Sequence, residues 1–398
     1  MKILHVTPYF PPGTAFGGTP EAVFALARAQ MELGHDVLVL TTDASFLHEQ
    51  KREGLEISQI AQPSIRAIGY LDDLKIIYVK NKIPSLVPYK FFTPKLVHPV
   101  VLSSLPDGID VVHFHEVNIS GYKKLAQHAL SLRARIVISP HGSFAPPTHT
   151  GIRKILHRFL DPLYQKHWLA HAAFFVAVSS LEKKQLLEMN IPESNIHTLP
   201  LGEPELFRNQ HRSEVPVPPS PYKTFLYLGR ISKQKGALLL VHTFEELLNK
   251  GFPGRLILCG RVEDRTSAFR RYMDFHAPDR PGIFIIPPVS NTQIIRLFQI
   301  TQATVCPSPY ESFGLVPVES LKCGVPVIIT EAYGCLEFLN RNQLPLVIIP
   351  VNHPAALSDA LESFSIPKNP NPENHLLPSW KEVAQKLVTM YTQAGVQK

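Results

Sequence analysis

The first part of the chain alternates short apolar runs with stretches of helical spacing. Residues 3–6 form an apolar run, a loop rich in proline and glycine follows as far as Gly18, and residues 20–33 place apolar side chains on one helix face. Gly34 ends that helix, and residues 37–40 form the next apolar run. This order predicts a strand, a loop, a helix and a second strand.

The same unit recurs further along the chain. Three more short apolar runs predict strands, at residues 111–115, 136–139 and 174–178. Residues 122–132 have helical spacing, and Ser179 or Ser180 is suited to cap a helix that follows the last of these strands. Strands that alternate with helices predict a parallel, doubly wound sheet.

A proline-rich break separates this pattern from a second one. Residues 213–221 hold too many prolines for a helix or a central strand. The alternation then restarts, with strands predicted at 224–228, 255–259, 283–286 and 303–307 and helices at 236–249 and 292–300. We therefore predict an N-terminal domain of residues 1–212, a linker of residues 213–222, a C-terminal domain of residues 223–375, and a helix in residues 376–398 that packs back on the first domain.

Composition adds a few limits to this picture. The 398 residues suffice for two cores, and no apolar run reaches the length that a membrane span needs. The start of the chain lacks a signal-peptide pattern, and the four cysteines lack C-x-x-C spacing, so we expect a cytoplasmic protein with reduced thiols. The formal net charge of +7 is too small to indicate nucleic-acid binding, but it favours anionic ligands or an anionic membrane surface.

The loops that follow the predicted strands are the candidates for chemistry, because open parallel sheets bind ligands beyond the carboxyl ends of their strands. Two such domains would hold a ligand in the cleft between them. The most informative loop contains Glu311 and leads into a helix that we expect to begin near Pro317 and to contain Glu319. The first amides of that helix could bind a phosphate, and the two glutamates could accept hydrogen bonds from sugar hydroxyls. Alternatively, both glutamates merely favour the start of a helix.

Two further loops could contact the same phosphates. Arg230 and Lys235 follow the strand at 224–228 and could converge on a diphosphate, although charged residues in loops are commonly only solvated. Gly17 and Gly18 would let the backbone approach a ligand closely. Their loop lacks the G-x-G-x-x-G spacing of dinucleotide-binding folds, which weakens the case for an NAD-dependent enzyme.

Histidines follow two strands of the first predicted domain. His113 and His115 point to one face of their strand, and His141 follows the next strand. They could contact a substrate, or they could be structural histidines with hydrogen-bond partners in the core. We predict no metal site, because a third ligand is not evident and the chain contains no D-x-D sequence.

Taken together, these segments resemble the retaining family 4 of the GT-B glycosyltransferases, which includes bacterial mannosyl- and glucosyltransferases of envelope assembly. The resemblance spans nearly the whole chain and depends on the order and spacing of its motifs. It is carried by Gly17-Gly18, the V-H-F-H-E-x-N segment at 112–118, His141-Gly142, Ala177-Val178-Ser179, Gly229-Arg230 with Lys235-Gly236, the E-x7-E of Glu311 and Glu319, and a closing helix at 380–391.

The resemblance implies two Rossmann-like domains that face a cleft and transfer of a hexosyl unit from a UDP- or GDP-sugar with retention. The acceptor would be a glycan or a lipid-linked sugar, and no metal or other cofactor would be needed. No carboxylate is assigned as a nucleophile. The acceptor hydroxyl would instead attack on the face from which the diphosphate departs. We expect a cytoplasmic enzyme, which could also associate with the inner face of the plasma membrane.

The resemblance also implies roles for individual residues. Arg230 and Lys235 would hold the donor diphosphate, and Glu319 would bind the ribose. His115 would face the donor sugar from the other domain, with support from His141. The remaining contacts would be made by Glu311 and the backbone of Ser312, Phe313, Gly314 and Leu315, which hold the sugar and phosphate, and by Gly17 and Gly18, which close over the diphosphate.

Three segments depart from the family's usual pattern. The P-N-G-V-D turn between the domains is replaced by residues 200–204, P-L-G-E-P. A glycine-rich turn is reduced to the single Gly260, and a G-G-x-x-E segment begins here with Tyr333 and Gly334. The specificity for sugar and base is therefore left open.

Two basic segments and three other protein classes complete the expectations. Lysines and arginines alternate with aromatic residues at 70–99 and 151–171, which suits an anionic membrane or a lipid-linked acceptor, or else a solvated face over buried aromatics. A GT-B epimerase or phosphorylase would share the fold. A non-catalytic sugar-binding relative would be expected to lack some of the residues Arg230, Lys235, Glu311 and Glu319, all of which are present.

Overall fold

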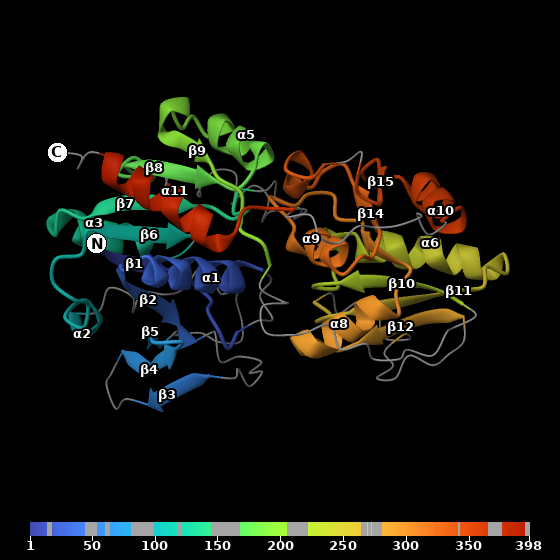
Figure 1. The fold of residues 1–398 in the computed structure, drawn as a ribbon, viewed down its shortest axis with the longest axis horizontal. Helices are drawn as coiled ribbons and strands as arrows, with labels where there is room; N and C mark the ends of the chain where they lie inside the picture. Colours follow the sequence, from blue (N-terminus) through green and yellow to red (C-terminus); the bar gives the residue numbers. More distant parts are fainter. Residues whose placement is uncertain are drawn as a thin grey trace, which may run out of the picture. The chain divides into compact units, whose positions relative to one another are not determined.

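The chain forms two compact units in a computed structural model (Figure 1). Unit 1 contains Met1–Gly202 and Pro378–Lys398, and unit 2 contains Glu203–Leu377. The structure describes residues 1–13, 18–43, 54–59, 64–80, 99–117, 119, 121–144, 168–204, 222–263, 269, 272, 281–340, 343–364 and 376–394. The predicted boundary at residue 212 and the predicted linker, except Tyr222, lie outside these residues.

Unit 1 is built on a nine-stranded sheet with the order β3-β4-β5-β2-β1-β6-β7-β8-β9. Its strands are β1 (Lys2–Val6), β2 (Asp36–Thr42), β3 (Leu55–Gln59), β4 (Ile65–Leu71), β5 (Leu74–Val79), β6 (Val111–His115), β7 (Arg135–Ser139), β8 (Phe174–Ala177) and β9 (Ile196–Thr198). Its helices are α1 (Thr19–Glu32), α2 (Pro99–Leu102), α3 (Tyr122–Ser131), α5 (Ser180–Glu188) and α11 (Trp380–Gln393).

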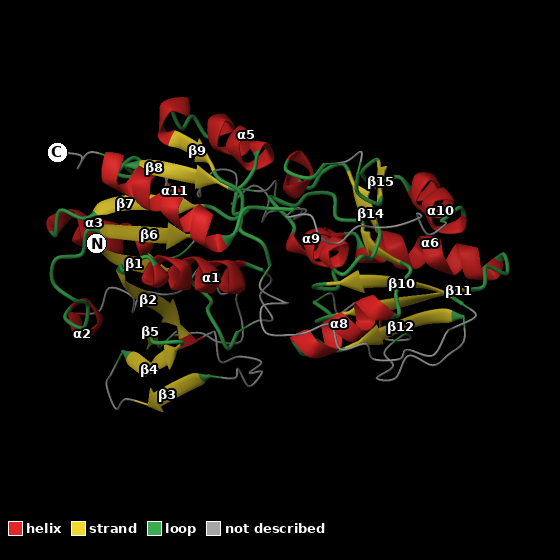
Figure 2. Ribbon diagram, in the orientation of Figure 1, coloured by secondary structure: helices red, strands yellow, loops and turns green. Residues whose placement is uncertain are grey.

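Unit 2 is built on a six-stranded sheet with the order β12-β11-β10-β13-β14-β15. Its strands are β10 (Lys223–Leu228), β11 (Gly254–Cys259), β12 (Gly282–Ile286), β13 (Ala303–Cys306), β14 (Val327–Thr330) and β15 (Leu346–Ile349). Its helices are α6 (Ala237–Asn249), α8 (Asn291–Gln299), α9 (Leu315–Lys322) and α10 (Pro354–Glu362). Figure 2 shows the strands of each unit flanked by helices, and the prediction of two doubly wound α/β units is confirmed.

The order of strands reverses at one place in each sheet. In unit 1 the chain places β2 beside β1, continues to β3 at the edge of the sheet, and comes back through β4 to β5, which pairs with β2. It then crosses to place β6 on the other side of β1. In unit 2 the same reversal lies between β10 and β13. Ligands of open α/β sheets bind beyond the carboxyl ends of the strands at such a reversal.

The sheet of unit 1 has an antiparallel edge that the strand-and-helix alternation does not predict. The pairs β3–β4 and β4–β5 are antiparallel, and Asp72 and Asp73 join β4 to β5 with φ angles of 48° and 64°. Two adjacent residues with positive φ match the twist of a tight hairpin, and aspartate tolerates this conformation better than most residues. The Asp-Asp pair between two apolar runs is thus the sequence signal that could have predicted this hairpin.

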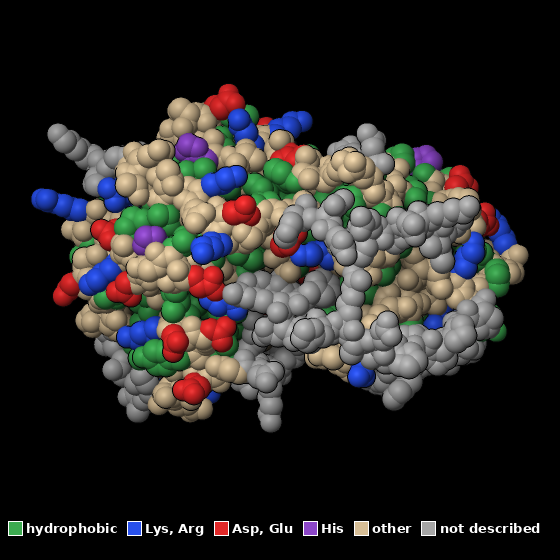
Figure 3. Space-filling model, in the orientation of Figure 1, with side chains coloured by type: hydrophobic (Ala, Val, Ile, Leu, Met, Phe, Trp, Pro, Cys, Tyr) green, Lys and Arg blue, Asp and Glu red, His purple; other side chains and the backbone are tan. Residues whose placement is uncertain are grey.

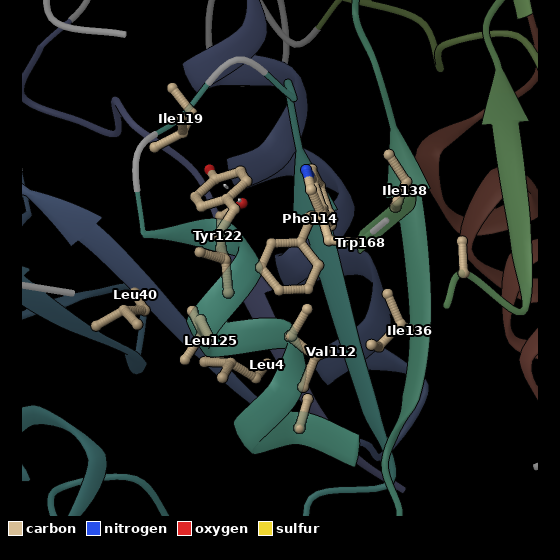
Figure 4. Close-up of a cluster of buried hydrophobic side chains, with 14 of the residues drawn as sticks. Leu4, Leu40, Val112, Phe114, Ile119, Tyr122, Leu125, Ile136, Ile138 and Trp168 are labelled. Carbon is tan, nitrogen blue, oxygen red and sulfur yellow. Dashed lines mark hydrogen bonds between the residues drawn. The ribbon is translucent and has the colours of Figure 1, made fainter. Parts of the chain in front are cut away.

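Apolar side chains cover both faces of the unit 1 sheet. On one face α3 packs over Leu4, Val112 and Ile136, and Trp168 closes the same layer (Figure 4). On the other face α1 and α11 pack together over the alternate positions of the same strands. A capping box between Ser379 and Glu382 begins α11. The predicted helix near the C-terminus thus packs on unit 1.

The remaining predicted helices and strands are present within a few residues of their expected bounds, with one difference that bears on the site. The helix that we expected to begin near Pro317 begins at Leu315. Proline is tolerated in the first turn, because an amide at that position would have no partner within the helix. None of the helices in the described ranges has the length and apolarity to cross a membrane.

Candidate functional site

Predicted residues follow both strands at the reversal point of unit 2. Arg230 and Lys235 lie between β10 and α6, and Glu311 lies between β13 and α9. Because β10 and β13 are neighbouring parallel strands, their carboxyl ends lie at the same edge of the sheet. The topology therefore brings these three residues to the place where such a sheet binds ligands.

An ion pair between Lys235 and Glu311 joins the two loops. Lys235 Nζ lies 2.6 Å from Oε1 of Glu311, and the two side chains are 24% and 20% exposed. The Ser308 hydroxyl lies 3.0 Å from the same Oε1 and 3.3 Å from the carbonyl oxygen of Lys235. The backbone of Glu311 also forms a parallel bridge with Tyr333. Glu311 is therefore held by both its side chain and its main chain.

Arg230 pairs with Glu263, a residue that the sequence did not single out. Its Nη1 lies 3.2 Å and 3.1 Å from the two carboxylate oxygens, and both side chains are about one third exposed. The hydroxyl of Tyr227 donates a 2.6 Å hydrogen bond to the carbonyl oxygen of Arg230. Burial, and then the nearby Glu311, raise the pKa of Tyr227 well above its usual range, so this hydroxyl remains a donor.

Close backbone contacts fix the shape of these loops. Gly236 has a φ angle of 73°, and a Cβ there would overlap the carbonyl group of Pro307. Gly260 has a φ angle of 150°, and a Cβ there would overlap the carbonyl group of Gly229. The single glycine that remains of the family's glycine-rich turn is thus the one that the strand-end packing requires.

The start of α9 has a similar constraint. Gly314 caps the helix with a φ angle of 92°, and a Cβ there would overlap the ring of Tyr333. Phe313 is buried, whereas Ser312 and Leu315 are half-buried. Tyr333, which stands where the family has its first glycine, therefore packs directly beneath the turn that precedes α9.

The first turn of α9 can donate hydrogen bonds to an anion. The amides of Leu315 and Val316 are in the first turn, where an α-helix leaves N–H groups without helical partners, and Pro317 has no amide hydrogen. Glu319 follows on the same short helix and is half-buried. The two glutamates thus flank the N-terminus of α9, and the earlier helix start places Glu319 one turn into it.

In unit 1 the predicted histidines belong to a longer hydrogen-bonded chain, which is buried except at its half-buried end, His141. Nε2 of His5 lies 2.7 Å from Oε1 of Gln30, and Nδ1 of His5 lies 2.8 Å from Nε2 of His115. Nδ1 of His115 lies 2.9 Å from Nε2 of His141. The predicted pair at the ends of β6 and β7 is therefore brought together, and β1 and α1 extend the chain into the core.

A second branch begins at the same glutamine. Nε2 of Gln30 donates to the hydroxyl of Tyr391 at 3.5 Å, and that hydroxyl lies 2.7 Å from Nδ1 of His113. Nε2 of His113 lies 2.8 Å from the hydroxyl of Ser139. This branch links α1, α11, β6 and β7 across one face of the sheet.

Burial keeps these histidines neutral. Loss of solvent lowers the pKa of His5 and of His141 to about 4, and it lowers the pKa of His113 and His115 well below 6.5. At neutral pH each ring therefore carries one proton, which can donate, and one bare nitrogen, which can accept.

Ring nitrogens of His5, His113 and His115 lie within 4.8 Å of one another, close enough for a metal site. The prediction that a third ligand is missing is therefore wrong. However, both nitrogens of each of these rings already have a hydrogen-bond partner. A metal ion would have to replace those hydrogen bonds, so the geometry favours the hydrogen-bonded chain.

The loop that carries His141 is held by a buried carboxylate. Glu182 accepts hydrogen bonds from the amides of Gly142 at 2.5 Å and Val178 at 2.9 Å. Burial raises the pKa of Glu182 to about 7, against the effect of these two hydrogen bonds. His141 itself has a φ angle of 50°. Glu182 thus stabilises an unusual turn at the end of β7, and sequence reasoning missed it because a lone glutamate in a first helical turn is common.

The other predicted residues of unit 1 are only partly within the described ranges. Gly18 is the N-cap of α1, with a φ angle of −78°, and Gly17 lies outside the described residues. Tyr78 and Trp168, two aromatics of the basic segments, are core residues, but most of both segments lies outside the described ranges. In the view of Figure 3, basic and acidic side chains of the described residues are interspersed.

Comparisons with known proteins agree with this fold. Residues 16–202 match the family described as "Glycosyltransferase Family 4", and residues 209–374 match the family described as "Glycosyl transferases group 1". A GDP-mannose:cellobiosyl-diphosphopolyprenol alpha-mannosyltransferase of Xanthomonas campestris is 25% identical over 93% of this chain and 88% of its own length. A D-inositol 3-phosphate glycosyltransferase of Pseudarthrobacter chlorophenolicus is 29% identical over 40% of this chain and 38% of its own length.

A solved structure is similar over the full chain. The catalytic domain of starch synthase IV from Arabidopsis thaliana, bound to ADP and acarbose, superposes with a TM-score of 0.71 at 15% sequence identity. The match covers 100% of this chain and 99% of that one. At this identity the similarity shows the fold.

Proposed function

Since the chain belongs to family 4 of the GT-B glycosyltransferases, we propose that it transfers a hexosyl unit, with retention, from a UDP- or GDP-sugar to a glycan or lipid-linked acceptor of the cell envelope. That it is a glycosyltransferase with a nucleotide-sugar donor follows from its family and its relatives. The retention, the nucleotide, the acceptor and the cellular role are the proposed parts.

The observation that carries the proposal is the set of groups at the reversal point of unit 2. Arg230 and Lys235 supply two cations there, the first turn of α9 supplies amides, and Glu311 and Glu319 supply carboxylates. A nucleoside diphosphate sugar presents two phosphates to cations and amides and several hydroxyls to carboxylates. Each part of the sugar donor, its phosphates and its hydroxyls, therefore has a matching partner among these residues.

The proposed chemistry depends on stabilising the departing diphosphate. As the bond between sugar and phosphate breaks, negative charge develops on the phosphate oxygens, and Arg230, Lys235 and the α9 amides would stabilise it. The carboxylate of Glu311 accepts hydrogen bonds from Lys235 and Ser308, which suits a group that orients the hydroxyls of a sugar. We propose no covalent intermediate on it. The acceptor hydroxyl would attack on the face from which the diphosphate leaves and would pass its proton to that phosphate.

The acceptor and the cellular location rest on the relatives. The Xanthomonas campestris mannosyltransferase is named for a GDP-mannose donor and a diphosphopolyprenol-linked acceptor. A lipid-linked acceptor would place the enzyme at the inner face of the plasma membrane, as a cytoplasmic protein held there peripherally. We propose no metal or other cofactor for the reaction.

The first test is donor binding and turnover. Calorimetric titration with UDP and GDP should identify the nucleotide, and incubation with UDP-glucose and GDP-mannose should release it. Arg230→Ala should lower kcat on the order of 10²-fold, as the loss of one donor to a developing anion does elsewhere. Near-normal turnover in this variant would refute the assignment of Arg230.

Arg296→Ala is the matched control. Arg296 is exposed on α8 of the same unit, so this variant changes the net charge equally without touching the proposed site. Its turnover should equal that of the wild type. Conversion of the donor sugar without release of nucleotide would instead identify an epimerase.

A further inference from the structure

Gln30 of α1 is a buried amide at the head of both hydrogen-bond branches in unit 1. It is fully buried, and its two polar atoms contact different partners, His5 through Oε1 and Tyr391 through Nε2. An amide differs from a histidine or a hydroxyl because its oxygen only accepts and its nitrogen only donates. With its oxygen toward His5 and its nitrogen toward Tyr391, Gln30 therefore sets the direction of every hydrogen bond that follows.

The direction of the first branch follows step by step. The oxygen of Gln30 accepts, so His5 carries its proton on Nε2 and its Nδ1 must accept from His115. His115 then carries its proton on Nε2, and its Nδ1 accepts from Nε2 of His141. The Nδ1 of His141 ends the branch as an acceptor. It contacts no hydrogen-bonding group within the part of the chain that the structure describes.

The second branch requires the same tautomer for His113. The hydroxyl of Tyr391 accepts from Gln30, so its one hydrogen is donated to Nδ1 of His113. His113 must then carry its proton on Nε2 and donate to Ser139. Both branches thus require the Nε2–H tautomer in each of their histidines.

We propose that Gln30 is a positioning residue that fixes these tautomers and makes Nδ1 of His141 a hydrogen-bond acceptor at the carboxyl end of β7. A row of neutral imidazoles alone can run in either direction. With the Gln30 amide oriented as in the structure, the reversed row would set the bare Nε2 of His5 against the oxygen of Gln30 at 2.7 Å, a contact between two acceptors. The ligand group that fits the end of the branch is a hydroxyl donor, such as a sugar hydroxyl, and this part rests on the proposed function.

Nuclear magnetic resonance tests the tautomers without any substrate. The full-length protein with 15N-labelled histidine rings should show His5, His113, His115 and His141 as neutral rings with the proton on Nε2 at pH 7.5. Single substitutions of each histidine assign the signals. A proton on Nδ1 of His141 or His115, or a cationic ring in the row, would overturn the proposal.

Two substitutions of Gln30 separate positioning from packing. Gln30→Met keeps the length of the side chain but removes the acceptor, so His141 should show a mixture of tautomers and kcat should fall about tenfold, as for the loss of one hydrogen bond. Gln30→Glu keeps an acceptor for His5 but removes the donor to Tyr391. It should keep the tautomers of His5, His115 and His141 and lose the fixed tautomer of His113.

Ile77→Ala is the control for loss of packing. Ile77 is buried on the opposite face of the same sheet, so this variant destabilises unit 1 without touching the branches. It should leave every tautomer unchanged. If Gln30→Met behaves as Ile77→Ala does, Gln30 has only a structural role. If Gln30→Met does not fold, the opposite responses expected of the two branches in Gln30→Glu decide the question.

Failure of the proposed function would be visible separately. A wild-type protein that releases no nucleotide from UDP-glucose or GDP-mannose but shows the expected tautomers would refute the transfer reaction and retain the role of Gln30. Nucleotide affinity, measured by calorimetry, should be the same within about twofold in Gln30→Met, because the cations, amides and carboxylates that carry the proposed function lie in unit 2.

Discussion

Each unit places polar side chains at the point where its strand order reverses, but the two sets are in opposite electrostatic states. At the reversal point of unit 1, buried histidines form a row of neutral hydrogen bonds. At the reversal point of unit 2, Arg230 and Lys235 form ion pairs with side chains that are a fifth to a third exposed. One unit thus removes charge from its site and the other keeps it near solvent.

The two arrangements differ in how readily their side chains can exchange partners. A buried hydrogen-bonded row cannot exchange partners without leaving a polar group unpaired, which costs about 1–3 kcal/mol for each group. Partly exposed ion pairs contribute little to stability and exchange partners readily. Unit 1 is therefore suited to hold a fixed pattern of hydrogen-bond donors and acceptors. In unit 2, Arg230 and Lys235 can exchange their glutamate partners for an anionic ligand.

The largest expected effect is loss of stability of unit 1 at acidic pH. The pKa of His5 is lowered from 6.5 to about 4 by burial, so this histidine's contribution to stability is complete above pH 6.5 and is lost as the pH falls toward 4. For His5 alone the loss is roughly 3 kcal/mol. Hydrogen exchange at pH 7.5 and pH 5, corrected for the intrinsic rate, should show peptides of unit 1 losing protection before those of unit 2.

One group in unit 1 acts in the opposite direction. The pKa of Glu182 is raised from 4.5 to about 7, so its contribution favours the folded state at low pH and is lost as the pH rises from 4.5 through 7. The four histidines outweigh it, because His113, His115 and His141 have lowered pKa values as well as His5. Earlier loss of protection in unit 2 would contradict the contrast between the units.

The next effect concerns the shape of the charged site. Gly314→Ala should destabilise unit 2 by about 2 kcal/mol, because the residue has a φ angle of 92° and its Cβ would overlap the ring of Tyr333. Nucleoside diphosphate binding should weaken too, since the turn leads into the first amides of α9. Thermal unfolding and calorimetric titration measure the two effects.

Gly251→Ala separates the two causes. Gly251 has a similar φ angle of 86°, and a Cβ there would meet nothing within 4 Å. This variant should show the cost of the backbone conformation alone and leave nucleotide binding unchanged. Equal effects on nucleotide binding in the two variants would show that the contact between Gly314 and Tyr333 does not shape the site.

The sequence predicted the framework well, because local patterns determine it. Apolar runs and helical spacing place β1, α1 and the strands β10 to β13 close to their observed bounds, whereas β14 and β15 were not predicted. Motif order then placed Arg230, Lys235 and Glu311 at one sheet edge, since parallel strands end together.

The partners of these residues could not be predicted in the same way. Glu263, Gln30 and Tyr391 have no local signal, because each meets its partner only through the tertiary fold. His5 lies in an apolar run, where its neighbours suggest only a buried strand. Whether a histidine donates or accepts depends on a contact that lies across the sheet, which spacing along the chain does not encode.

The smallest effect tests whether the ion pairs of unit 2 give way to a ligand. Glu263→Gln removes the carboxylate that holds Arg230 in a pair about one third exposed, so the change in stability should stay below about 1 kcal/mol. Glu263 competes with a diphosphate for the guanidinium of Arg230, and its negative charge also repels the diphosphate. The Glu263→Gln variant should therefore bind UDP or GDP about two- to tenfold more tightly than the wild type. Calorimetric titration measures the change, and uridine or guanosine should show none.

Glu246→Gln makes the same change in net charge at an exposed position on α6, away from the site. It should leave nucleotide affinity unchanged, which separates competition at Arg230 from a general effect of charge. Weaker binding in Glu263→Gln would mean that the glutamate orients Arg230 for the ligand. In that case the charged site would be as fixed by its partners as the neutral row of unit 1 is by Gln30, and the contrast between the units would be one of charge alone.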